Sequence, residues 1–199
     1  AMAAAIMMLT VAMTTMAAPG DVAIGMAPGV DAIITDVPEG KKPEAGFQES
    51  IFLTDLGLSA AQQKRFWYHA EAHGADAEQT MKIYVFYIAT AWAESNFRTG
   101  AMHGNKNGTT DGGIMQVNSV NVPDLVKAGV IESARDLHDP LKGIDAGVYL
   151  ADQCIRKFGV TENAYFHYNE GLYAKGKTNK NSRNMWAEYQ KFMKVLVEE

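Results

Sequence analysis

The sequence of 199 residues contains little cysteine and little proline, with Cys154 as its single thiol and six prolines. One thiol excludes an intrachain disulfide and any zinc site built from several cysteines. Hydrophobic residues make up 47% of the chain and charged residues 21%. This balance excludes a mainly disordered protein, a collagen-like fibre and a polytopic membrane protein. Stability must therefore come from an ordinary apolar core, which a chain of this length can supply.

Basic charge is also scarce overall. The net charge is -5 and the isoelectric point is about 5.5, which is not the profile of a nucleic-acid-binding protein. The charge is uneven, because residues 1–50 carry a net -4 and residues 171–194 a net +5. The basic stretch is either a solvated face of the fold or a local attraction for an anionic polymer, and both interpretations stay open.

Residues 1–20 carry no charge and include five methionines. The run Ala3–Val11 resembles the apolar core of a signal peptide, and residues 16–18 resemble a small-residue cleavage site, although the basic flank of such a signal is missing. Threonines weaken the interpretation as a membrane-spanning segment. The segment predicts either an export or membrane segment or a hydrophobic helix that packs on a partner.

A stretch rich in proline and glycine follows and indicates a linker that ends near Gly46. We therefore expect an N-terminal extension over residues 1–46 and a compact domain over residues 47–199. Ser59 and Gln62 have the spacing of a capping box and predict the start of a helix. Helices are predicted over residues 60–72, 77–95 and 140–158, over a short segment leading into 165–171, and after Ser182.

The helix predicted over residues 77–95 has no charged residue between Ile83 and Ala93. A helix that is apolar all round lies in the centre of a core. Glu94 comes at its end, where desolvation and the negative end of the helix dipole both raise the pKa of a carboxyl group. A carboxyl group held protonated near neutral pH can act as a general acid. Alternatively, the helix simply ends in water and Glu94 is a surface residue.

A small β-hairpin is predicted next. The Asn-Gly pair at 107–108 is a strong turn signal, and it is followed by a strand at 109–111. A second tight turn at Gly112-Gly113 then leads into a half-buried strand at 114–118. The hairpin would bring Asp111 back toward the helix end and turn Gln116 and Asn118 toward a cleft. The predicted fold class is therefore α+β, mainly helical, with a small hairpin beside the site.

Three motifs occur in order: Glu94-Ser-Asn-Phe, Gly113-Ile-Met-Gln-Val-Asn and Tyr168-Asn-Glu-Gly. Together they resemble the lysozyme-like domain of the soluble-type lytic transglycosylases, which cleave bacterial peptidoglycan. The resemblance covers about residues 58–196. One departure is Gly143, where the family usually has Asn, which puts one helix contact in doubt.

The segment from Glu94 to Ser119 is also similar to the active-site segment of animal c-type lysozymes, whose acidic pair has the same seventeen-residue interval as Glu94 and Asp111. Specialised transglycosylases attached to secretion systems share such an aspartate. The disulfides of the animal enzymes are absent here, so the specialised transglycosylases are the better match.

The resemblance implies that Glu94 and Asp111 are catalytic. Glu94 would protonate the leaving oxygen of a MurNAc-β-1,4-GlcNAc bond and later accept a proton, while the 6-hydroxyl of muramic acid attacks and leaves a 1,6-anhydro end. Asp111 would stabilise the cationic ring or position a nucleophile, or it is only a turn residue. Substrate binding is implied for Ser95, Gln116, Asn118, Tyr168 and Asn169. Ser95 is alternatively a helix-end cap.

No cofactor is expected, and the histidines show no metal-ligand spacing. The expected partner is the peptidoglycan glycan strand, in the periplasm or after export to the cell wall. Residues 1–46 would connect the enzyme to a secretion system, an effector or a virion assembly. Alternative functions are a hydrolytic lysozyme that uses Asp111 and water, an inactive binding module of lysozyme fold, and a chitin-active enzyme.

Overall fold

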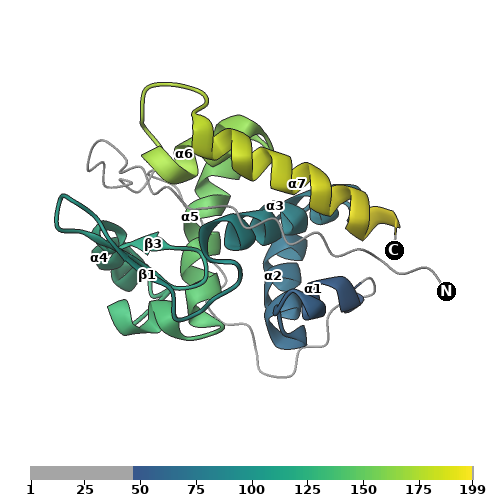
Figure 1. The fold of residues 1–199 in the computed structure, drawn as a ribbon, viewed down its shortest axis with the longest axis horizontal. Helices are drawn as coiled ribbons and strands as arrows, with labels where there is room; N and C mark the ends of the chain where they lie inside the picture. The colour runs from purple at the N-terminus through teal and green to yellow at the C-terminus, as the bar shows by residue number, and fades with distance from the viewer. Residues whose placement is uncertain (1–46, 199) are drawn as a thin grey trace.

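The computed structural model describes residues 47–198, so the predictions for residues 1–46 lie outside it. It confirms a mainly helical α+β fold with a small sheet at one side (Figure 1). The helices are α1 (Ile51–Asp55), α2 (Ala60–His73), α3 (Ala77–Ser95), α4 (Val122–Lys127), α5 (Lys142–Phe158), α6 (Glu162–Glu170) and α7 (Lys180–Glu198), with two 3-10 turns, η1 (Ser119–Asn121) and η2 (Ala134–His138). The strands are β1 (Met102–Gly104), β2 (Thr110–Gly112) and β3 (Val117–Asn118).

Helix α3 forms the centre of the core, as its apolar composition predicts. Every side chain from Ile83 to Ala91 is buried, and α2, α5 and α7 all pack against it. Asp76 caps its first turn by accepting a hydrogen bond from the Gln79 N–H, and Asn96 ends it in the left-handed conformation, with φ of 53°. The buried helix therefore delivers Glu94, in its last turn, to the side of the molecule that carries the sheet.

The sheet is antiparallel in the order β1-β2-β3. The predicted turn at Asn107-Gly108 is confirmed, but the predicted strand over 114–118 is wrong in its first half. Gly113 and Gln116 both have positive φ, 78° and 47°, and the Gln116 N–H donates to the Gly113 carbonyl at 3.2 Å. This closes a turn, which we call the 113–116 turn, and only Val117 and Asn118 join the ladder. Strand β1 was not predicted, because all three of its residues are exposed and no alternation marks it.

Two glycines let α5 approach the 113–116 turn. A Cβ at Gly147 would lie 2.4 Å from the Cβ of Met115, and a Cβ at Gly143 would lie 2.4 Å from the Leu137 carbonyl oxygen. The departure from the family pattern at Gly143 therefore has a steric reason. In this chain the position has no room for a side chain.

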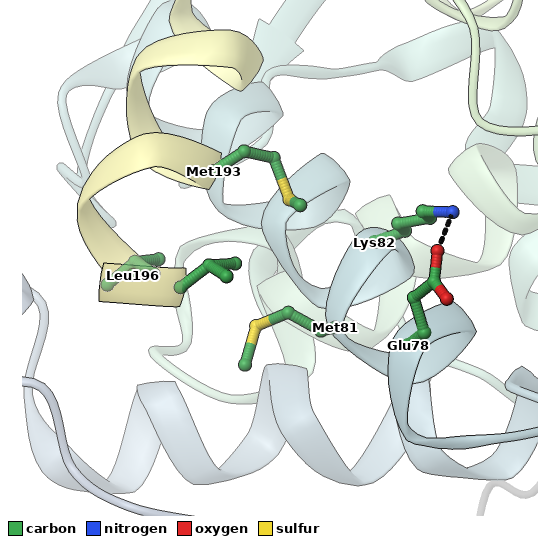
Figure 2. Close-up of a pocket in the computed structure, with 6 residues that line it drawn as sticks. Glu78, Met81, Lys82, Met193 and Leu196 are labelled. Atoms are coloured by element: carbon green, nitrogen blue, oxygen red, sulfur yellow. Dashed lines mark hydrogen bonds and ion pairs between the residues drawn. The ribbon is translucent and has the colours of Figure 1, made fainter. Parts of the chain in front are cut away.

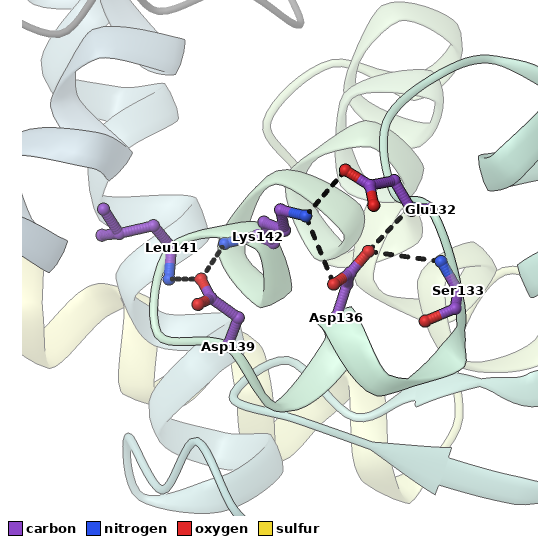
Figure 3. A network of polar contacts seen from close by, with 6 residues as sticks. All are labelled: Glu132, Ser133, Asp136, Asp139, Leu141 and Lys142. Carbon is purple, nitrogen blue, oxygen red and sulfur yellow. Dashed lines mark hydrogen bonds and ion pairs between the residues drawn. The ribbon is translucent and has the colours of Figure 1, made fainter.

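A polar network holds η2 and the start of α5 (Figure 3). Asp136 accepts hydrogen bonds from the N–H groups of Glu132 and Ser133 at 2.7 and 3.2 Å, and pairs with Lys142 at 3.3 Å. Asp139 accepts from the first N–H groups of the α5 region, those of residues 141 and 142. The network fixes the loop whose Leu137 carbonyl packs against Gly113, and so supports the turn beside the site.

Candidate active site

Glu94 combines partial accessibility with an apolar setting. Its side chain is half-buried at the end of α3. Burial, and to a lesser degree the negative charge of Asp111, together raise its pKa to about 8. The Glu94 carboxyl is therefore protonated at neutral pH while part of it remains open to solvent. This is the state that a general acid requires.

Asp111 lies on β2, half-buried, with both carboxylate oxygens oriented by amide groups. The Asn118 Nδ2 donates to its Oδ1 at 2.7 Å, and the Asn105 Nδ2 donates to its Oδ2 at 3.0 Å. Asn118 is itself fixed, because its Oδ1 accepts from the Val120 N–H at 3.0 Å. Sequence reasoning assigned no site role to Asn105. Its place at the predicted turn, six residues before Asp111, was the available signal.

Tyr168 joins the helical part of the molecule to the 113–116 turn. Its hydroxyl donates to the Met115 carbonyl at 2.7 Å. Burial raises the pKa of Tyr168 well above its usual range, and the negative charges of Glu94 and Asp111 add to the effect. The three side chains therefore lie within electrostatic reach of one another, although they come from α3, β2 and α6.

Gln116 folds back onto its own turn. Its Nε2 donates to the Gly113 carbonyl at 2.9 Å and to the Ala101 carbonyl at 3.2 Å. The residue remains half-buried rather than fully enclosed. Gln116 therefore stabilises the turn beside Asp111, and its contact with sugar stays a prediction.

Ser95 and Asn169 make their contacts inside the protein. The Ser95 side chain has no exposed surface, and its hydroxyl donates to the Ile114 carbonyl at 2.6 Å. The Asn169 Nδ2 donates to the Tyr165 carbonyl at 3.0 Å and lies 2.9 Å from the Met185 sulfur on α7. Both side chains therefore stabilise the packing of the helices that carry them. A direct role in substrate binding stays a prediction for each.

An apolar pocket of about 460 Å³ lies between the first half of α3 and the last turns of α7 (Figure 2). Glu78 and Lys82 form an ion pair at its edge. Sixteen residues separate Glu78 from Glu94 on the same helix, or about 24 Å at 1.5 Å per residue. The pocket is therefore remote from the acidic pair. Its remaining lining residues are Met81, Met193, Leu196 and Val197.

No group of three or more His, Cys, Asp or Glu side chains within residues 47–198 is arranged to hold a metal ion. Over the same residues, no helix has both the length and the hydropathy needed to cross a bilayer. Cys154 is fully buried on α5, and burial raises its pKa to about 12. A thiol that is buried and has a raised pKa is a packed, unreactive side chain.

The comparisons with known proteins agree with this geometry. Residues 72–191, more than half of the chain, match the family model of the transglycosylase SLT domain. The chain is 30% identical over 113 residues to the invasion protein IagB of Salmonella typhi and to that of Salmonella typhimurium strain LT2. Each match covers 56% of this chain and 70% of the relative. No solved structure matches. The chain therefore belongs to the transglycosylase SLT domain family, and it is a peptidoglycan lytic transglycosylase with a lysozyme-like α+β fold.

Proposed function

We propose that the enzyme cleaves the MurNAc-β-1,4-GlcNAc bond of peptidoglycan and leaves a 1,6-anhydro end on the muramic acid. The single observation that carries this proposal is the Glu94 carboxyl, which is accessible and whose pKa of about 8 keeps it protonated at neutral pH. A glycosidic bond departs through an oxocarbenium-like state, so the leaving oxygen needs a proton. A carboxyl group whose pKa is raised to about 8 can supply that proton at neutral pH.

The proposed reaction has two halves. In the first, Glu94 donates its proton to the bridging oxygen as the bond from C1 of muramic acid to that oxygen breaks, and GlcNAc leaves with a free hydroxyl. In the second, the 6-hydroxyl of the same muramic acid bonds to C1 and its proton returns to the Glu94 carboxylate. Asp111 stabilises the cationic ring between the two halves. General acid–base catalysis of this kind contributes about 10²- to 10⁴-fold.

A hydrolytic reaction is the second candidate, and the fixed orientation of Asp111 is the observation that favours it. With both of its oxygens positioned by Asn105 and Asn118, the carboxylate has the geometry to orient a water molecule as well as to stabilise a cation. In that reaction water replaces the 6-hydroxyl as the group that attacks C1.

Product analysis distinguishes the two reactions. Purified sacculi are digested with the wild type and with Glu94→Gln side by side, and the muropeptides are identified by mass spectrometry. The proposal expects ends that are one water lighter than hydrolysed ends, and no products from Glu94→Gln. Reducing ends of full mass would establish the hydrolase instead. Substantial cleavage by a folded Glu94→Gln protein would remove Glu94 from the mechanism.

We propose further that residues 1–46 are an extension that delivers the domain of residues 47–199 to the cell wall. The substrate implies action outside the cytoplasm, and we place the enzyme in the periplasm or in an exported assembly. The uncharged first twenty residues support an export signal or a docking segment for a secretion system, an effector or a virion assembly. Fusion of residues 1–46 to a reporter that is active only after export tests the first role. If the reporter stays in the cytoplasm, the segment is not an export signal, and docking remains as its proposed role.

A further inference from the structure

We propose that the loop between α6 and α7, residues 171–179, is an additional binding site for peptide-bearing glycan, with Tyr173 as a platform for a sugar ring and Lys175 and Lys177 as partners for the carboxylates of the stem peptide. This inference rests on the proposed function, because it takes peptidoglycan as the substrate. The loop starts three residues after Tyr168 and projects from the end of α6 (Figure 1).

Tyr173 is an exposed ring with a fixed position. Its exposed fraction is 53%, whereas the neighbouring Leu172 is buried and anchors the loop. The Lys157 ammonium lies 4.4 Å from the Tyr173 ring centroid and donates to the Leu172 carbonyl at 3.2 Å. One face of the ring is therefore covered by a cation, and the ring remains open to solvent elsewhere. Such an aromatic ring offers a large apolar surface at little cost in conformational entropy.

The rest of the loop is also folded back on the protein. The Ala174 N–H donates to the Gly171 carbonyl at 3.0 Å. Gly176 has φ of +134° and packs so closely on the Phe166 ring that a Cβ would lie 2.7 Å from it. At its far end, the Asn179 Nδ2 donates to Glu170 at 2.7 Å. These contacts order the loop before a ligand arrives, which reduces the entropy lost on binding.

The loop carries positive charge that forms no ion pair with a carboxylate of residues 47–198. Lys175 and Lys177 flank Gly176 and are exposed, and Lys180 and Arg183 follow in the first turn of α7. Among the ion pairs of residues 47–198, none includes any of these four side chains. Exposed cations of this kind attract carboxylates, and salt screens the attraction. A glycan that carries stem peptides supplies carboxylates beside its sugar rings.

Helix α5 connects the loop to the turn beside the acidic pair. Helix α5 touches the 113–116 turn at Gly147 and the loop at Lys157. Ten residues of helix separate these positions, about 15 Å along the axis. A strand of several sugars is long enough to contact both regions at once. The loop therefore adds affinity for long, peptide-bearing strands without touching the bond that is cleaved.

Binding is measured with the full chain carrying Glu94→Gln, so that the probe is not degraded. The two probes are purified sacculi and insoluble chitin, which is an uncharged amino-sugar polymer. We expect Tyr173→Ala to weaken co-sedimentation with both probes about tenfold, as truncation of a central tyrosine does at other interfaces. We expect Lys175→Gln/Lys177→Gln to weaken binding to sacculi about threefold at low salt, and to leave chitin binding unchanged.

The matched control is Lys64→Gln/Lys194→Gln, which removes the same charge from exposed positions on α2 and near the end of α7. We expect it to bind both probes as the parent does. The inference is overturned if Tyr173→Ala binds both probes normally, or if the control loses as much sacculus binding as the loop variant does. A wild-type protein that fails to cleave sacculi would refute the proposed function, whereas these binding losses would still be measured independently.

Discussion

The Ser95 hydroxyl donates to the Ile114 carbonyl at 2.6 Å, and this bond joins the last turn of α3 to the 113–116 turn. Both residues are fully buried. Glu94 immediately precedes Ser95, and β2, which carries Asp111, ends immediately before the turn. The bond therefore fixes the element that carries the acid relative to the element that carries its partner. Ser95 is a positioning residue in this arrangement.

Ser95→Ala tests that interpretation. The substitution leaves the buried Ile114 carbonyl without this donor, which costs about 1–3 kcal/mol in the free energy of unfolding. We expect a lower urea midpoint, and a lower kcat on soluble glycan strands with little change in KM. Ser95→Thr keeps the hydroxyl and serves as the comparison. Unchanged stability together with a raised KM would instead indicate that Ser95 binds the sugar directly.

The activity should depend on pH through Glu94. Its pKa is raised to about 8, first by burial and then by the charge of Asp111. The protonated form is the acid that the reaction uses, so kcat/KM should fall as the pH rises through about 8, with a loss of about tenfold between pH 7 and pH 9. The measurement is a pH profile on soluble glycan strands. A profile that stays flat up to pH 10 would contradict the assignment of Glu94 as the acid.

The same carboxyl group should make the folded state less stable at higher pH. Its folded pKa of about 8 lies above the ordinary value of 4.5, so between these values the folded state binds more protons than the unfolded state. Its contribution is therefore greatest below pH 4.5 and declines as the pH rises to about 8. Glu94→Gln does not titrate and should melt higher than the wild type at pH 8, while the difference shrinks at pH 5. A lower melting temperature for the variant at pH 8 would show that ionising the Glu94 carboxyl does not destabilise the folded state.

The sequence was sufficient to predict the central helix α3 and the place of Glu94 at its end, because the signals there are local. Asp76 caps the first turn of α3, and the uncharged run from Ile83 to Ala93 predicts burial on all sides. A glutamate that ends such a run is either desolvated by the packing around it or exposed where the helix meets water. The structure selects the first alternative, because burial is the main cause of the raised pKa of Glu94.

The surroundings of Asp111 could not be predicted in the same way, because they depend on contacts between distant residues. Alternation of apolar and polar residues predicts a strand at Ile114, but positive φ at Gln116 and the approach of Gly147 on α5 turn the chain there instead. Strand β1 exists only because β2 pairs with it. The inward contacts of Asn169 depend on Met185 of α7, which no pattern within α6 indicates.

Asp111 and Asn105 should act as a coupled pair. Asp111→Asn removes the charge that stabilises the cationic ring, and we expect a smaller loss of kcat than Glu94→Gln causes. Asn105→Ala removes one of the two donors that orient the carboxylate, and we expect a loss of about 3- to 10-fold in kcat, corresponding to about 1 kcal/mol of coupling. Combined with Asp111→Asn, the Asn105→Ala substitution should add little. Additive losses in this double-mutant cycle would mean that Asn105 acts independently of Asp111.

Gly147→Ala should reverse the usual effect of replacing glycine in a helix. Alanine within a helix is ordinarily more stable than glycine by about 0.5–1 kcal/mol. At this position the added Cβ would lie 2.4 Å from the Cβ of Met115, which cannot rotate away, so we expect overpacking to destabilise the protein by about 1–3 kcal/mol. The Met115 carbonyl accepts the Tyr168 hydroxyl, so a displaced turn should also lower kcat. Gly100→Ala is the control, since nothing lies within 4 Å of a Cβ there. A Gly147→Ala variant with wild-type activity and a higher melting temperature would show that α5 can move away from the turn without disturbing the site.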